Sequence, residues 1–377
     1  MRTITIFRAL VGAGHLDEAN RLWREFGESL LVSIGAYSTT VELLGPLATR
    51  GSVSLRSYLT SAYGFLGQLD LAVDFEAKIL AEVLEDEDTA EIEVSLSRLK
   101  TFYSISGAFI ATDRCLDLRE VLIAFDDETD RNGSVVLGRA IQAATRGLAE
   151  QAYGLLDQAE RLGPPSNNPW FEDDIQFLRL YLALHADASL TQDQLSAALA
   201  TARSWDFRRD VASLRCSLHT RDRQYEQALA ASEEYEVLGR DAGLDVPPAR
   251  TAFLLARLGR TAEATAAVED ALTRLPRLHP FQRPHYHLAR ALRELGRHAE
   301  GVAHARQAYR RAWAEGPPNY LHWDLQDARE LLQEVGEPEP GLPVVDPVSV
   351  RIPLEDGIRA FITSLEAERR DSGDTGP

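Results

Sequence analysis

Apolar residues along this chain recur at helical spacing, in short stripes that come in pairs. A glycine or another turn-forming residue separates the two stripes, and a small residue, usually alanine, follows it five positions later. Such pairs predict two antiparallel helices that cross closely at the small residue. The pattern occurs at seven places: Gly14 with Ala19, Gly67 with Ala72, Gly107 with Thr112, Gly147 with Ala152, Arg223 with Ala228, Gly259 with Ala264, and Gly296 with Gly301.

These pairs are repeated at a nearly constant interval. From Gly67 onward the intervals are 40, 40, 76, 36 and 37 residues. Because 76 is about two periods, we expect a degenerate pair of helices between Phe177 and Trp205. The first gap, 53 residues from Gly14 to Gly67, is also long, and the apolar cluster from Val41 to Leu47 predicts an additional helix there. A regular period is typical of arrays in which each helix pair buries its apolar face against the next.

The two fullest copies start at Gly147 and Gly259 and indicate how each unit is built. Glycine is expected in the turn, where a positive φ costs it little. A proline stands seventeen positions after each glycine, at Pro164 and Pro276. We expect it to end the second helix, because proline has no N–H to donate and clashes with the preceding turn.

The pattern resembles the tetratricopeptide repeat in its small residues, aromatics and terminal proline. The resemblance is good at Leu59, Tyr63, Gly67, Leu69 and Ala72, and at Leu288, Ala289, Leu292, Gly296 and Ala308. It implies an all-α fold, a right-handed α-solenoid of tetratricopeptide-like helix-turn-helix repeats. The intervals exceed the roughly 34 residues of the standard unit, so longer helices or connections are expected.

The two ends of the chain resemble the C-terminal repeat arrays of bacterial STAND-type NTPases, which are large signalling ATPases. This resemblance rests on Ile34–Leu47 and on the tail from Ala305 to Glu355. The sequence contains no G-x-x-x-x-G-K-[ST] run, and its two lysines, Lys78 and Lys100, do not follow a glycine. We therefore expect either an array that acts with a separate effector or the product of a split or truncated gene.

The predicted organisation is one array followed by a short tail. The array covers residues 1–336 and ends in a capping helix, and residues 337–353 form a proline-rich connector. Residues 354–369 form a short amphipathic helix, which folds back onto the array or docks on a partner. Residues 370–377 are expected to be disordered.

The charge argues against nucleic acid as a partner. The net charge is −18, and binding phosphates requires clustered cations. Residues 201–320 nevertheless contain 19 arginines against 15 acids, so this stretch carries +4 and the remainder carries −22. No apolar stretch approaches the roughly 18 residues that span a membrane, and no secretory signal is visible. A cytoplasmic location is expected, with Cys115 and Cys216 packed as small hydrophobes.

The resemblance places the first helix of each unit along a concave face, which assigns candidate binding residues. In the C-terminal half these are Arg221, Phe253, Arg257, Arg283, Tyr286, Arg290 and Arg293. Guanidinium groups beside aromatic rings suit carboxylates, so an acidic segment or a C-terminal carboxylate is the expected ligand. The alternative is that these arginines cover solvated helix faces.

The same positions in the N-terminal half are small and neutral: Ser57, Ser61, Ser97 and Thr101. Such a surface lets a peptide backbone approach closely and offers hydroxyls to its amides. The alternative is that the small side chains are there because nothing larger fits between stacked helices.

No motif points to catalysis, a cofactor or a metal. His285 and His287 are two apart and would face different directions on a helix, and neither has an acid or cysteine at the spacing of a zinc site. The predicted function is a non-catalytic protein- or peptide-binding scaffold or sensor, acting with a separate effector such as a STAND-like ATPase in signalling or defence. The alternative is an allosteric receptor for a small peptide; an enzyme or a nucleic-acid binder is disfavoured.

Overall fold

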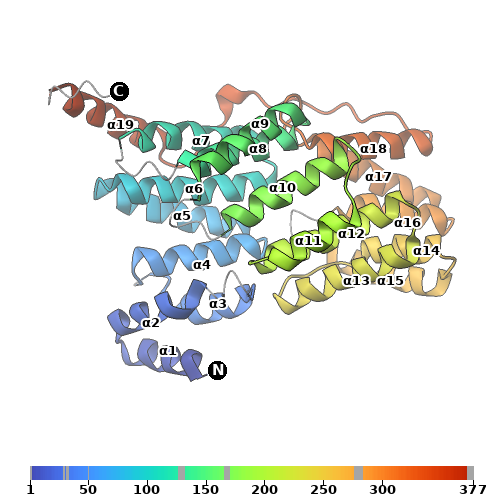
Figure 1. Ribbon diagram of the computed structural model, residues 1–377, viewed down its shortest axis with the longest axis horizontal. Helices are drawn as coiled ribbons and strands as arrows, with labels where there is room; N and C mark the ends of the chain where they lie inside the picture. Colours follow the sequence, from blue (N-terminus) through green and yellow to red (C-terminus); the bar gives the residue numbers. More distant parts are fainter. Residues whose placement is uncertain are drawn as a thin grey trace.

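The fold is all-α, as predicted (Figure 1). A computed structural model describes residues 2–28, 30, 34–49, 51–125, 132–164, 170–275 and 283–371. These ranges contain nineteen α-helices and no β-strand. Within them, no helix is long and apolar enough to cross a bilayer.

The helices follow one another with short connections. In the first half they are α1 (Arg2–Ala13), α2 (Leu16–Glu28), α3 (Tyr37–Leu44), α4 (Val53–Phe65), α5 (Leu69–Glu85), α6 (Thr89–Ser106), α7 (Phe109–Ile123), α8 (Asn132–Thr145), α9 (Ala149–Leu162) and α10 (Phe171–His185). In the second half they are α11 (Gln192–Thr201), α12 (Trp205–Arg221), α13 (Tyr225–Asp241), α14 (Ala249–Arg257), α15 (Thr261–Arg274), α16 (Pro284–Glu294), α17 (His298–Trp313), α18 (His322–Glu334) and α19 (Glu355–Asp371).

The seven predicted turns have the expected backbone conformation. All six glycines have φ between 74° and 83°, and Arg223 has φ 58°. The small residue five positions later is buried in every unit, because the second helix crosses the first at that point. At Gly301, an added Cβ would lie 3.2 Å from the carbonyl oxygen of Ala289 on the facing helix. The sequence pattern therefore identified the turn and the crossing point correctly.

The two irregular regions also contain the predicted helices. α3 lies between the first and second pairs and packs against α4, while α10 and α11 occupy the long interval before Trp205. α9 ends at Leu162, just before Pro164, as expected. Pro276, the corresponding proline of the later unit, lies outside the described residues.

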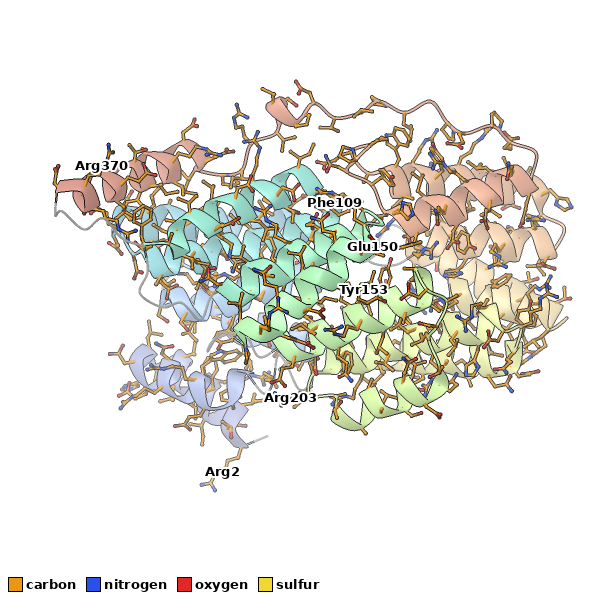
Figure 2. The ribbon with its side chains drawn as sticks, turned by 45° about the horizontal axis from the view of Figure 1, so that its top comes forward. Arg2, Phe109, Glu150, Tyr153, Arg203 and Arg370 are labelled. Carbon is orange, nitrogen blue, oxygen red and sulfur yellow. The ribbon has the colours of Figure 1, made fainter. Side chains whose placement is uncertain are left out.

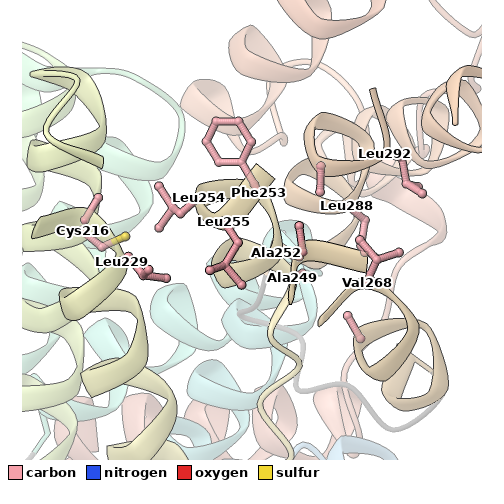
Figure 3. Close-up of a cluster of buried hydrophobic side chains, with 14 of the residues drawn as sticks. Cys216, Leu229, Ala249, Ala252, Phe253, Leu254, Leu255, Val268, Leu288 and Leu292 are labelled. Carbon is pink, nitrogen blue, oxygen red and sulfur yellow. The ribbon is translucent and has the colours of Figure 1, made fainter. Parts of the chain in front are cut away.

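Neighbouring helices bury small and branched side chains between them. In one core cluster, residues from α12 to α16 meet around Phe253, Leu254 and Leu288, each at most 1% exposed (Figure 3). Cys216 lies in this cluster, and Cys115 is fully buried in another. The two cysteines are thus packed as small hydrophobes, as predicted.

The C-terminal segment returns to the first half of the chain. After α18, the connector runs along α17, where the Trp313 Nε1–H donates to the carbonyl oxygen of Pro343 (2.9 Å). α19 then lies beside α7 (Figure 1) and packs on α5 and α7. Its Ile358 and Phe361 insert into their core. Folding back of this helix is therefore confirmed. The helix extends to Asp371, so the prediction of disorder from residue 370 was wrong for residues 370 and 371. Residues 372–377 lie outside the described residues.

Two contacts between distant parts of the chain close the molecule on itself. In the first seam, the Tyr37 hydroxyl of α3 donates to Asp206 of α12 (2.5 Å), and the Tyr37 and Trp205 rings pack edge to face. In the second seam, Glu315 accepts a hydrogen bond from the backbone N–H of Ile110 (2.8 Å), beside Phe109 at the start of α7 (Figure 2). A carboxylate is stabilised there by the free N–H groups and the dipole of the helix N-terminus.

Candidate ligand-binding cavity

The helices surround a large cavity that is partly open to solvent, which we call the central cavity. It has a volume of about 1120 Å³, slightly above the roughly 300 to 1,000 Å³ usual for ligand sites. Its walls come mainly from the first helix of each predicted pair: α4, α6, α8, α10, α12, α14 and α16. The first seam lies at its edge, since Asp206 lines the cavity and also accepts the Tyr37 hydrogen bond.

Five of the residues predicted from sequence line this cavity: Ser57, Ser61, Ser97, Thr101 and Arg283. The Ser57 hydroxyl donates to the Val53 carbonyl oxygen (2.8 Å), and the Thr101 hydroxyl donates to the Ser97 carbonyl oxygen (3.1 Å). Each of these two hydroxyls donates its hydrogen to a carbonyl oxygen of its own helix, and its oxygen can still accept a hydrogen bond from a ligand amide.

The other six predicted residues do not line the cavity. Three of them are arginines paired with nearby acids: Arg221 with Asp222, Arg257 with Glu294, and Arg293 with Glu334. The last two pairs join α14 to α16 and α16 to α18, so these guanidinium groups connect helices of neighbouring units.

The remaining three form a small stack behind the cavity wall. Phe253 is a core residue, 1% exposed, and the Arg290 guanidinium lies over its ring at 4.0 Å. Arg290 also donates to the Tyr286 hydroxyl (3.3 Å). His285 meets His304 of α17 in its own helix pair, with their Nδ1 atoms 2.8 Å apart.

Most charged groups of the cavity wall were not selected by the sequence patterns. Four of its arginines have carboxylate partners: Arg98 with Glu76, Arg119 with Glu93, Arg209 with Asp206 and Asp210, and Arg283 with Asp324 and Asp327. Because partly enclosed charges are costly unless paired, these bridges stabilise the wall. Except for Asp206 and Asp210, which share α12 with Arg209, the acids come from other helices, so no local spacing in the sequence revealed them.

Three cations of the wall have no carboxylate partner among the described residues: Lys100, Arg250 and Arg311. Arg250 donates instead to the carbonyl and hydroxyl oxygens of Ser213, at 3.2 and 3.1 Å, and to the His287 ring. Burial, with the nearby Arg283 cation, lowers the pKa of Arg311. Burial, with Arg119, lowers the pKa of Lys100 to about 8.

Asp174 of α10 is an anion of the wall that likewise has no ion-pair partner among the described residues. Within the described ranges, no cation lies within ion-pair distance of its carboxylate, although Lys100 is close enough to stabilise the charge. Burial raises the pKa of Asp174 to about 7, and the neighbouring Asp206 and Asp210 act in the same direction. Asp206 and Asp210 pair with Arg209, which leaves Asp174 without an ion pair in this part of the wall.

Besides the charged groups of α6, α7 and α13, two zones of opposite charge can be defined in the wall. The acidic zone contains Asp174, Asp206, Arg209 and Asp210, and the basic zone contains Arg250, Arg283, His287, Arg311 and Asp324. The pKa of His287 lies well below its usual value, because of burial and of the arginines around it, so its ring is neutral near pH 7. Tyr235 lies between the zones, with the Arg250 guanidinium 5.8 Å from its ring centre.

The arrangement is suited to binding. The described residues contain no group of three side chains placed to hold a metal ion. Aromatic rings such as Phe65, Phe177 and Tyr181 provide apolar surface between the charged groups. Neither a known protein family nor a characterised protein matches this chain.

Proposed function

We propose that this protein is a non-catalytic receptor that holds a short peptide segment in the central cavity. The observation that carries the proposal is a cavity of about 1120 Å³ whose wall keeps charged groups of both signs without an ion-pair partner among the described residues. Unpaired, partly enclosed charges are unfavourable in an empty protein and favourable when a ligand supplies the missing partners.

The two seams favour a peptide receptor over an open scaffold for folded proteins. Tyr37 with Asp206, and Glu315 with Ile110, join distant helices around the cavity. A folded partner would need this face to be open, whereas a segment of a few residues fits inside. Serine and threonine hydroxyls in the N-terminal half of the wall suit a peptide backbone.

The proposal includes the architecture and the signalling role suggested by sequence. The consecutive helix pairs form a right-handed solenoid of tetratricopeptide-like repeats, and filling the cavity changes how tightly the seams close. A separate cytoplasmic effector, such as a STAND-like ATPase, reads this change. The likeness of the two chain ends to STAND sensor arrays supports this part of the proposal.

Filling the cavity provides the direct test. Ser97→Trp on α6 places a large ring in the cavity, whereas Gln158→Trp adds the same ring on the exposed face of α9. Binding of a mixture of synthetic randomised peptides of two to eight residues is measured by affinity selection and mass spectrometry. The parent and Gln158→Trp should retain the same peptides, and Ser97→Trp should lose them. Retention by neither the parent nor the control would reject the proposed function.

A further inference from the structure

The cations that lack a carboxylate are concentrated in the basic zone. Every other arginine of the wall has an acid partner, but Arg250 and Arg311 do not among the described residues. The lining groups of this zone are three arginines and Asp324, and Arg283 also pairs with Asp327, which leaves an excess of one positive charge. A ligand carboxylate would supply the missing acceptor, and the planar guanidinium group binds it with paired hydrogen bonds.

The acidic zone has the opposite excess. Asp206 and Asp210 pair with Arg209, and with Asp174 the zone carries two negative charges when all three carboxylates are ionised. The nearby Lys100 reduces this to one. The Tyr37 hydroxyl already donates to Asp206. Asp174 is the carboxylate left for a new donor, and an ammonium group would satisfy it with both charge and hydrogen bonds.

α10 fixes the distance between the two zones. At its start, Asp173 accepts a hydrogen bond from the backbone N–H of Ser204 (2.6 Å), which places Asp174 beside the acidic residues of α12. At its end, the His185 ring stacks on Trp323 at 5.9 Å, next to Asp324 of the basic zone. With a rise of about 1.5 Å per residue, the helix from Asp174 to Tyr181 and His185 spans roughly 10 to 16 Å.

We infer that the ligand is a short free peptide whose terminal ammonium group binds at Asp174 and whose terminal carboxylate binds at Arg250 and Arg311. An extended chain covers about 3.3 to 3.6 Å per residue, so the spacing of the zones selects peptides of about three to five residues. This inference rests on the proposed function, and it adds that the cavity recognises both ends of the peptide.

Blocking the ends of the peptide tests the inference. The most strongly retained peptides from the randomised mixture are resynthesised with free ends, with an acetylated amine, and with an amidated carboxylate. Their dissociation constants are measured by calorimetry at pH 7.5. Each block should weaken binding about tenfold or more, because it removes a charge-assisted hydrogen bond.

Variants assign each end of the peptide to its zone. Asp174→Asn should weaken binding of the free peptide and leave binding of the acetylated peptide unchanged. Arg311→Gln should weaken binding of the free peptide and leave binding of the amidated peptide unchanged. Glu172→Gln and Arg310→Gln, on exposed positions of α10 and α17, are the matched controls and should bind like the parent. Thermal melting confirms that each variant is folded.

The outcomes separate the inference from the proposed function. If peptides bind in the cavity but tolerate both blocks, recognition of the ends is wrong while the peptide receptor stands. If the Asp174 and Arg311 variants weaken blocked and free peptides equally, the assigned residues are wrong. Absence of any peptide binding to the parent rejects both.

Discussion

At the scale of single residues, backbone conformation explains the most regular feature of this chain. Seven turns use a positive φ, and six of them have glycine, the residue that pays least for that conformation. Arg223 holds φ 58° with an exposed side chain at the seventh. A residue with a Cβ is strained in the left-handed region by about 1 to 2 kcal/mol.

Arg223→Gly should therefore stabilise the protein. Relief of the strain exceeds the entropy that an added glycine gives the unfolded chain, so we expect a gain of about 0.5 kcal/mol in the free energy of unfolding. The matched change is Gly259→Ala, where φ is 74° and nothing lies within 4 Å of the new Cβ; it should cost about 1 kcal/mol. Chemical denaturation measures both. A destabilised Arg223→Gly protein would mean that the arginine side chain contributes more than its backbone strain costs.

The pKa of Asp174 predicts how stability depends on pH. Its folded value of about 7 lies above the ordinary value near 4, so the folded state binds this proton more tightly than the unfolded chain. The stabilisation is complete below about pH 4 and is lost as pH rises through 7. Lys100, with its pKa of about 8, stays mainly charged over that range. Asp206 and Asp210 also act on Asp174, but a substitution of Asp174 leaves them in place.

Asp174→Asn should remove this loss. Relative to the parent, the variant should gain on the order of 2 kcal/mol in unfolding free energy between pH 4.5 and pH 7.5. Denaturation curves at both pH values measure the gain, and Glu172→Gln, on the exposed face of the same helix, should show none. A constant difference between variant and parent at both pH values would contradict the raised pKa.

The binding residues predicted from sequence line the cavity in the N-terminal half of the chain, but in the C-terminal half only Arg283 does. Counting back from the turn glycine, the residues ten and six before Gly107 and Gly147 line the cavity: Ser97, Thr101, Leu137 and Ile141. In the units at Gly259 and Gly296, the residues nine before, Arg250 and His287, face it, whereas Phe253 and Arg290 do not. The helices α14 and α16 are short, so only their first turns reach the cavity.

At the scale of helices, the pattern along the chain was sufficient for most elements. Helix pairs, the extra helix α3 and the degenerate pair α10 and α11 all follow from apolar spacing, because each is defined by contacts with its neighbours. α19 shows the limit of such reasoning. Its apolar stripe was visible in the sequence, but no local pattern indicated that α5 and α7 are the helices it covers.

The docking of α19 predicts a large effect from a small truncation. Ile358 is fully buried against the core of α5 to α7, so Ile358→Ala should cost about 2 to 4 kcal/mol in unfolding free energy. Thr363→Ala, on the exposed face of the same helix, should be nearly neutral. Hydrogen exchange should show faster opening of α5 and α7 in the first variant alone. Unchanged stability of Ile358→Ala would mean that α19 is not held on this surface.

At the scale of the whole molecule, the two seams distinguish a closed shape from an open row of helices. Their partners are 169 residues apart for Tyr37 and Asp206 and 205 apart for Ile110 and Glu315. Repeat periodicity describes contacts between adjacent units only, so it carries no signal for such pairs. A second bond of the same seam, from Arg146 to Asn319 (2.7 Å), is equally hidden from the sequence.

Opening both seams should expand the protein without unfolding it. A compact chain of 377 residues has a radius of gyration of about 21 Å, which we expect for the parent in small-angle X-ray scattering. The double variant Tyr37→Ala, Glu315→Ala removes the central side chain of each seam and should have a larger radius, with an unchanged helical circular dichroism signal. Tyr153→Ala, Glu330→Ala removes the same side-chain types elsewhere, from α9 and from an exposed position of α18, and should keep the parent radius. An unchanged radius in the seam variant would show that these contacts do not hold the molecule closed, because adjacent helix packing alone would then suffice.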